Sequence, residues 1–201
     1  MIEPIPESSE QTYDLFLREG TGGIVFRLKD HGITAGAAQL GYSIDGYRVS
    51  RPYDSISTVT LSTAAAGRAG VMGQCVIAFR GGVRLVIWSA NAAGLPDRSR
   101  EGPFRDFVVD FHRRLIASNA DRRITFIRGI SGTRHTILMV ALVIWAVLFI
   151  AFPLLLALFT GTPNAALVAL AGLALVVPFW RVADRNRPGS YNPSYPPDLL
   201  A

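Results

Sequence analysis

The sequence predicts an α+β soluble domain of about seven antiparallel strands and one C-terminal amphipathic helix, followed by two transmembrane α-helices. Three observations carry this prediction. Apolar residues alternate with a period of two between residues 21 and 89, the pattern of half-buried strands. The period becomes 3.6 between Phe104 and Leu115, as in a helix with one apolar face. No Asp, Glu, Lys or Arg occurs between Arg134 and Arg181, as in membrane helices.

The composition divides the 201 residues into four predicted segments. We expect a flexible N-terminus over 1–20, a domain over 21–128, a helical hairpin over 136–183 and a Pro/Tyr-rich tail over 184–201. The first residues are acidic and rich in Pro, Ser and Glu, which favours disorder. They also lack the apolar run of a secretory signal peptide.

The hairpin prediction depends on the lengths of two apolar runs. The run over 137–159 is long enough to cross a hydrocarbon core of ~30 Å at ~1.5 Å per residue. The run over 165–180 is shorter and reaches spanning length only if the helix begins at Pro163 and continues through Ala183. We therefore expect helices over 136–159 and 163–183.

Turn residues locate the strands. Asp45-Gly46 separates two alternating runs, which is a strong hairpin signal because a type I′ turn needs positive φ at both positions. Gly81-Gly82 separates the runs 74–80 and 83–89 in the same way. Further strands are expected over 24–29 and 56–63, a loop over 64–73, and a short strand or interfacial segment over 123–128.

One helix follows the strands, with Pro103 in its first turn. Its apolar face consists of Phe104, Phe107, Val108, Phe111 and Leu115. Its opposite face, which we expect to meet solvent, consists of Arg105, Asp106, Asp110, His112, Arg113 and Arg114. A helix with an aromatic face suits the open end of a two-sheet or barrel-like domain, whose interior must be closed.

Residues 22–119 resemble pleckstrin-homology-like (PH-like) domains in their bacterial, membrane-tethered form. The resemblance rests on the stretch YSIDGYRVSRPYDSISTVTL, the hairpin CVIAFRGGVRLVIWS and the helix PFRDFVVDFHRRL. It implies two sheets closed by the C-terminal helix. Eukaryotic members bind phosphoinositides through a basic loop between the first two strands. The corresponding region here carries Arg27, Lys29 and His31, followed by the charge-free residues 36–42, and departs from that pattern.

Arginines flank both ends of the predicted hairpin but are absent from the loop that joins its two helices. Residues 1–60 hold eight acidic and five basic residues (net −3), and residues 61–135 hold five acidic and twelve basic residues (net +7). The candidate contacts with the membrane surface are Arg122, Arg123, Arg128, Arg134, Arg181, Arg185 and Arg187. The loop over 160–164 carries no charge. The positive-inside rule therefore places both termini in the cytoplasm of a bacterial inner membrane, with the lipid bilayer rather than nucleic acid as partner.

The second apolar run contains a seam of small residues. Ala165, Ala169 and Gly172 fall at i, i+4 and i+7, where another helix can approach closely. The seam serves either the first helix of the same hairpin or a larger membrane protein.

Catalytic and metal-binding motifs are missing from the sequence. His31, His112 and His135 are far apart, and no metal-ligand or phosphate-loop spacing occurs. Cys75 is the only cysteine, so it forms no disulfide within the chain. We expect no enzyme activity, no metal and no cofactor.

The tail over 185–201 has four prolines and two tyrosines. This composition favours an extended, polyproline-like segment. It is either disordered or a peptide that docks on this domain or on a partner.

Three functions follow as hypotheses. The first is a non-catalytic membrane-anchored PH-like module that scaffolds or recruits a protein partner at the cytoplasmic face. The second is an accessory subunit of a transporter or respiratory-type complex, docked through its hairpin. The third is a sensor of anionic lipid.

Overall fold

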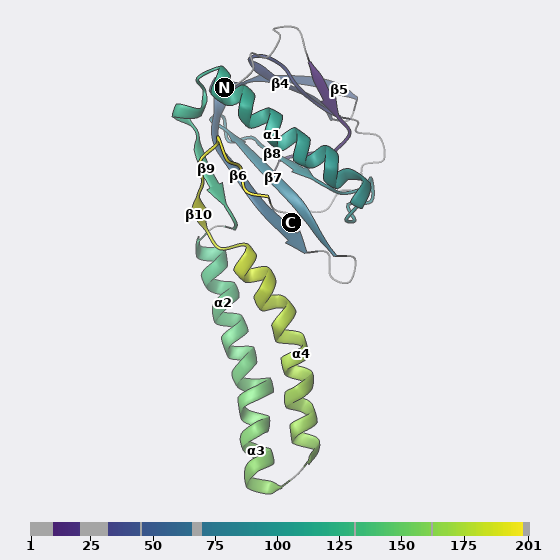
Figure 1. The fold of residues 1–201 in the computed structure, drawn as a ribbon, viewed down its shortest axis with the longest axis vertical. Helices are drawn as coiled ribbons and strands as arrows, with labels where there is room; N and C mark the ends of the chain where they lie inside the picture. Colours follow the sequence, from purple (N-terminus) through teal and green to yellow (C-terminus); the bar gives the residue numbers. More distant parts are fainter. Residues whose placement is uncertain are drawn as a thin grey trace. The chain divides into compact units, whose positions relative to one another are not determined.

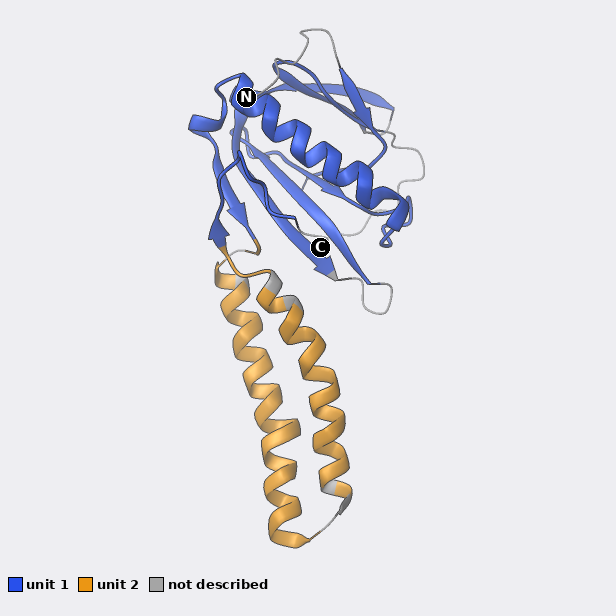
Figure 2. Ribbon diagram, in the orientation of Figure 1, with its two compact units in different colours: residues 1–128, 189–201 blue, residues 129–188 orange. Residues whose placement is uncertain are grey.

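The computed structural model describes residues 10–20, 32–44, 46–65, 70–130, 132–161 and 163–198. The predicted strand over 24–29 and the candidate residues Arg27, Lys29 and His31 lie outside the described residues. The chain forms two compact units, one of residues 1–128 and 189–201, the other of residues 129–188 (Figure 2). All described strands except a short one over Gly189–Ser190 precede the helical unit, and the α+β class is confirmed.

Two sheets build the first unit (Figure 1). The smaller has the order β1 (Gln11–Tyr13), β3 (Ile33–Ala35), β4 (Gln39–Ile44) and β5 (Tyr47–Pro52). The larger has the order β10 (Gly189–Ser190), β9 (Thr125–Arg128), β6 (Ile56–Ala65), β7 (Val71–Phe79), β8 (Arg84–Trp88) and β2 (Phe16–Glu19). Every described pairing is antiparallel except β9 with β6, which is parallel.

Both predicted hairpins are confirmed. Ile44 pairs with Tyr47 across a two-residue connection, and Gly46 has the positive φ that such a turn requires. The second connection joins β7 to β8, and the amide of Phe79 donates to the carbonyl of Val83. The loop expected over 64–73 is shorter than predicted, because Ala64 pairs with Met72 and extends both strands.

The N-terminal segment differs from the prediction. Residues expected to be flexible form β1 and β2, and Tyr13, Leu15 and Leu17 are buried. These three residues alternate, as a strand with one buried face requires. This alternation covers only three apolar residues and directly follows a Pro/Ser/Glu-rich segment. It is therefore too short to predict a strand against the disorder that the preceding composition favours.

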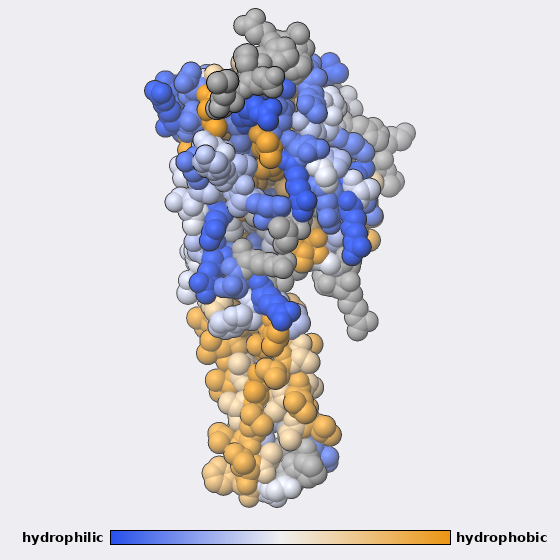
Figure 3. Space-filling model, in the orientation of Figure 1, coloured by the Kyte–Doolittle hydropathy of each residue, from blue (hydrophilic) through white to orange (hydrophobic). Residues whose placement is uncertain are grey.

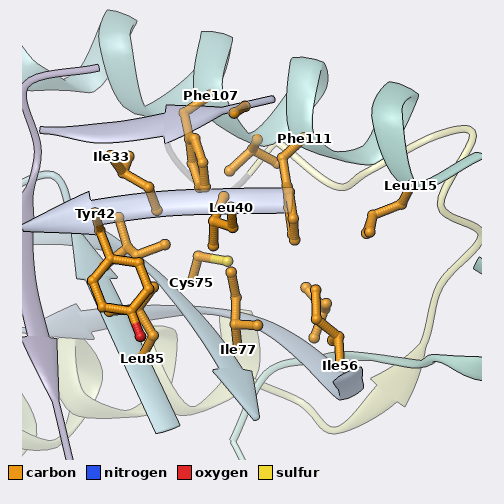
Figure 4. Packing of buried hydrophobic residues seen from close by; sticks show 14 of the residues in the cluster. Ile33, Leu40, Tyr42, Ile56, Cys75, Ile77, Leu85, Phe107, Phe111 and Leu115 are labelled. Atoms are coloured by element: carbon orange, nitrogen blue, oxygen red, sulfur yellow. The ribbon is translucent and has the colours of Figure 1, made fainter. Parts of the chain in front are cut away.

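Helix α1 (Glu101–Ala117) closes the sheets as expected. Phe107, Phe111 and Leu115 point from α1 toward the strands (Figure 4) and have no exposed surface. The rings of Phe107 and Phe111 are stacked with centroids 5.5 Å apart, and Tyr53 meets Phe111 edge-on. Gly73 lies against the ring of Phe104, where a Cβ atom would clash. The aromatic face of α1 is therefore the centre of the core.

The second unit is a pair of helical arms. One arm contains α2 (Gly132–Ala146), a π-helical turn (Val147–Ala151) and α3 (Phe152–Thr160), and the other is α4 (Pro163–Arg185). Residues His135–Thr160 form one helix long and apolar enough to cross a membrane, and α4 contains the shorter apolar stretch Ala166–Arg181. Large apolar side chains are exposed along both arms (Figure 3).

Candidate functional site

The described part of the tail docks on the first unit by extending its larger sheet. In β10, Gly189 pairs with Arg128 and Ser190 pairs with Ile127 of β9. The amide of Tyr191 then donates to the carbonyl of Phe126 at 3.3 Å. Of the alternatives left open by the sequence, docking on this domain is the one observed for residues 189–198. We call the surface formed by β9 and α1 under these residues the tail groove.

A histidine on α1 binds the first aromatic residue of the tail. The Nδ1 atom of His112 lies 2.6 Å from the carbonyl oxygen of Val108, and its Nε2 atom lies 2.7 Å from the hydroxyl of Tyr191. Because a carbonyl only accepts, Nδ1 carries the proton and donates it. The Nε2 atom is therefore the acceptor, and the hydroxyl of Tyr191 donates to it.

Burial keeps both partners of this hydrogen bond neutral. It lowers the pKa of His112 to about 4, although the hydrogen bond to the carbonyl of Val108 opposes this shift. Burial also raises the pKa of the Tyr191 hydroxyl above its usual range. The rings of His112, Phe126 and Tyr191 lie with centroids 5.5 to 5.6 Å apart. This aromatic cluster is the centre of the tail groove.

The prediction that His112 and Arg114 lie on a solvated face is wrong. The exposed fraction is 1% for His112 and 3% for Arg114. The helix is covered on a second side, because β9 and Tyr191 pack against His112. A signal was present in the sequence: Phe104, Val108 and His112 repeat at i, i+4 and i+8, which is one helical stripe.

Arg114 is buried with a charge partner. Its Nε atom donates to the carboxylate of Asp110 at 2.8 Å. Tyr13 of β1 faces the same carboxylate; its burial first, and then the charge of Asp110, raise the pKa of its hydroxyl. Asp110 and Arg114, which were expected to meet solvent, therefore form a largely buried ion pair that connects α1 with β1.

The far end of the tail groove is only partly filled. Asp198 forms an ion pair with Arg105 of α1 at 3.3 Å. Between α1 and this part of the tail lies a pocket of about 120 Å³, lined by Phe104, Arg105, Val108, Val109, Pro196, Pro197 and Asp198. Val109 has an exposed fraction of 47%. The tail thus covers one end of the groove closely and leaves apolar surface open at the other.

The predicted membrane-surface arginines are distributed over both units. Arg122 and Arg123 are exposed in a 3₁₀ turn (Asp121–Arg123), and Arg128 is exposed at the end of β9. Arg181 is exposed in α4, and Arg187 pairs with Asp184 at 2.7 Å. Arg134 and Arg185 lie in α2 and α4, and their side chains are outside the described part.

The small-residue seam is used inside the hairpin. Ala169 has an exposed fraction of 4%. A Cβ atom on Gly172 would lie 2.6 Å from the carbonyl oxygen of Phe149. Pro153 lacks the N–H that would bond to this carbonyl at i−4 in a regular helix, and the π-helical turn Val147–Ala151 precedes it. The side chain of Ala165 is outside the described part.

The remaining candidates for chemistry lie apart. No group of three or more His, Cys, Asp or Glu residues in the described ranges is arranged to hold a metal ion. His135 lies in α2 and His112 in α1, in different units. Cys75 is buried in β7, and burial raises the pKa of its thiol to about 12, so it is a core residue rather than a nucleophile.

No family model, no curated protein and no solved structure matches this chain.

Proposed function

We propose that this chain is a non-catalytic, membrane-anchored PH-like module that recruits or scaffolds a protein partner at the cytoplasmic face of a bacterial inner membrane. The observation that carries the proposal is the tail groove: the domain binds an extended peptide by adding it to a sheet edge. Strand addition is a common mode of peptide recognition, since backbone hydrogen bonds give affinity and side-chain contacts give specificity.

The exposed surface of the helical unit supports the membrane anchor. The exposed apolar residues include Ile137, Leu148, Phe152, Phe159 and Leu170, with exposed fractions from 56% to 86%. Soluble monomers rarely expose so continuous an apolar surface. A bilayer would cover it, and the helical backbone already satisfies its own hydrogen bonds. Arginines at both ends of the hairpin and the uncharged 160–164 loop support a cytoplasmic location for both termini.

The architecture of the first unit supports the PH-like assignment. Two sheets are closed by one C-terminal helix with an aromatic inner face. In such an arrangement the helix plugs the open end of the sheets. In this chain α1 additionally presents His112 and Arg105 to the tail, so the same helix closes the core and binds a peptide.

Affinity purification of the full chain in mild detergent tests the proposal. We expect the wild-type chain to elute on size exclusion as a stable complex with a second protein at a fixed ratio. A variant of the exposed Leu95, Leu95→Ser, is the control for general surface changes and should retain the complex. Recovery of the chain alone, across several mild detergents and with cross-linking before lysis, would contradict a scaffolding role.

A further inference from the structure

We propose that the tail groove is an exchangeable peptide site, held in cis by the chain's own tail, which accepts an extended tyrosine-containing segment of a partner protein. The inference rests on the proposed function and specifies the partner's chemistry.

The tail contributes few side chains to the core of the domain. In the described residues, every buried member of the hydrophobic core lies between Tyr13 and Phe126 in the sequence. Among the described tail residues, Tyr191 packs against this core and is partly buried. Ser190, Asn192, Ser194 and Tyr195 are exposed. Exchange of residues 189–198 therefore removes none of the buried core side chains, and a segment that again covers His112 and Phe126 can replace them.

The tail does not fill the groove completely. Its regular pairing with β9 covers two residues. Beyond Tyr191 the tail turns, with the amide of Ser194 bonded to the side chain of Asn192 at 2.9 Å. The pocket of about 120 Å³ beside Pro196 and Pro197 is open. Unfilled apolar space forfeits dispersion contacts, so a segment with a larger apolar side chain at that point would bind better than the tail does.

The contacts define which segment fits. The edge of β9 selects an extended backbone with small residues, as at Gly189 and Ser190. The Nε2 atom of His112 accepts a hydrogen bond, so it selects a tyrosine hydroxyl next to those residues. Arg105 selects a carboxylate seven positions after the tyrosine. Proline between them restricts the backbone of the segment before binding and lowers the entropy lost.

Covalent attachment explains why the tail occupies the site in the absence of a partner. A short tether raises the effective concentration of a ligand to roughly the millimolar range. To displace the tail, a partner segment must bind the groove more tightly than the tail does, or must itself be attached to the membrane and so be present at a high local concentration. Weakening the tail alone should therefore open the site.

A fluorescent peptide with the sequence GSYNPSYPPD, residues 189–198, tests the proposal in detergent with full-length chains. We expect the peptide to bind the Tyr191→Ala chain at least tenfold more tightly than the wild type, whose tail competes. A peptide with Phe in place of the tyrosine at position 191 should bind about tenfold more weakly, because the buried Nε2 atom of His112 then has no donor. Adding His112→Phe to the Tyr191→Ala chain should abolish the difference between the two peptides.

Equal, negligible binding to the wild-type and Tyr191→Ala chains would overturn the proposal, provided that both chains melt cooperatively. A Tyr191→Ala chain that does not fold, together with a Tyr191→Phe chain that folds and still binds no peptide, would also overturn it, because the tail would then be a permanent part of the domain. Neither result would affect the purification experiment, which detects complexes of the wild-type chain through any surface.

Discussion

At the level of single residues, His112 connects helix α1 to the tail through a hydrogen bond to Tyr191. It is buried, neutral and bonded at both ring nitrogens. A protonated imidazole could keep its bond to the carbonyl of Val108, but Nε2 would become a donor facing the hydroxyl of Tyr191. The cost of charging the buried ring is the reason for its lowered pKa.

This lowered pKa predicts a dependence of stability on pH. The pKa is about 4 in the folded chain and 6.5 when unperturbed, so the unfolded chain takes up a proton first. The stabilisation is complete above pH 6.5 and is lost as the pH falls from 6.5 toward 4. We expect the free energy of unfolding to fall by up to about 1.4 kcal/mol per pH unit in this window. Thermal melts at pH 7 and pH 5 measure it.

The matched control is His112→Phe, which retains a ring but cannot be protonated. Its difference in unfolding free energy between pH 7 and pH 5 should be smaller than that of the wild type by about 2 kcal/mol, the share that His112 contributes. The same pH dependence in both chains would assign the effect to another group.

At the level of elements, the two helical arms pack closely where the first arm has its π-helical turn. Pro153 leaves the carbonyl of Phe149 without its helical partner, the π-helical turn adjusts the backbone, and Gly172 of α4 packs beside that carbonyl. Glycine allows this approach because it has no Cβ atom. The close approach of the two arms therefore depends on one position, Gly172 against Phe149, rather than on a repeated small-residue pattern.

This packing predicts that Gly172→Leu separates the arms. The new side chain would meet the backbone of Phe149, and overpacking of this kind costs about 1 to 3 kcal/mol. Ala171→Leu is the control, because Ala171 is exposed on the same helix. We expect a lower melting temperature in detergent micelles for Gly172→Leu only. Equal melting of both variants would show that the approach to Phe149 is not needed for packing.

At the scale of the whole molecule, the chain passes twice between its two units. The first passage follows Arg128 of β9 and the second precedes Gly189 of β10, and these two residues pair with each other. On the helical side, the amide of Ile130 donates to the carbonyl of Asn186 at 3.1 Å. The two passages are thus tied together on both sides. If the hairpin spans a membrane as proposed, both passages leave it on the same side.

The proposed topology is testable because the only native cysteine, Cys75, is buried and its thiol unreactive. In intact spheroplasts, a membrane-impermeant maleimide should label Thr160→Cys at the end of α3 and not Ser194→Cys in the tail. After permeabilisation both variants should be labelled, and the wild type should stay unlabelled throughout. Labelling of Ser194→Cys in intact spheroplasts would contradict the proposed topology, because the tail would then lie outside the cytoplasm.

The types of the main elements could be predicted from local sequence patterns. Alternation marked β4 to β8, the period of 3.6 marked α1, and the charge-free run marked the helical arms, because each pattern is local and follows from which side chains avoid water. The tail groove, in contrast, could not be predicted from such patterns, because it depends on contacts between distant parts of the chain. His112 and Tyr191 are 79 positions apart in the sequence. A periodic apolar pattern predicts that one face of a helix is buried, but it does not identify the segment that buries it. The second buried side of α1 exists because β9 and a returning tail cover it, and no local pattern in the tail indicates that return.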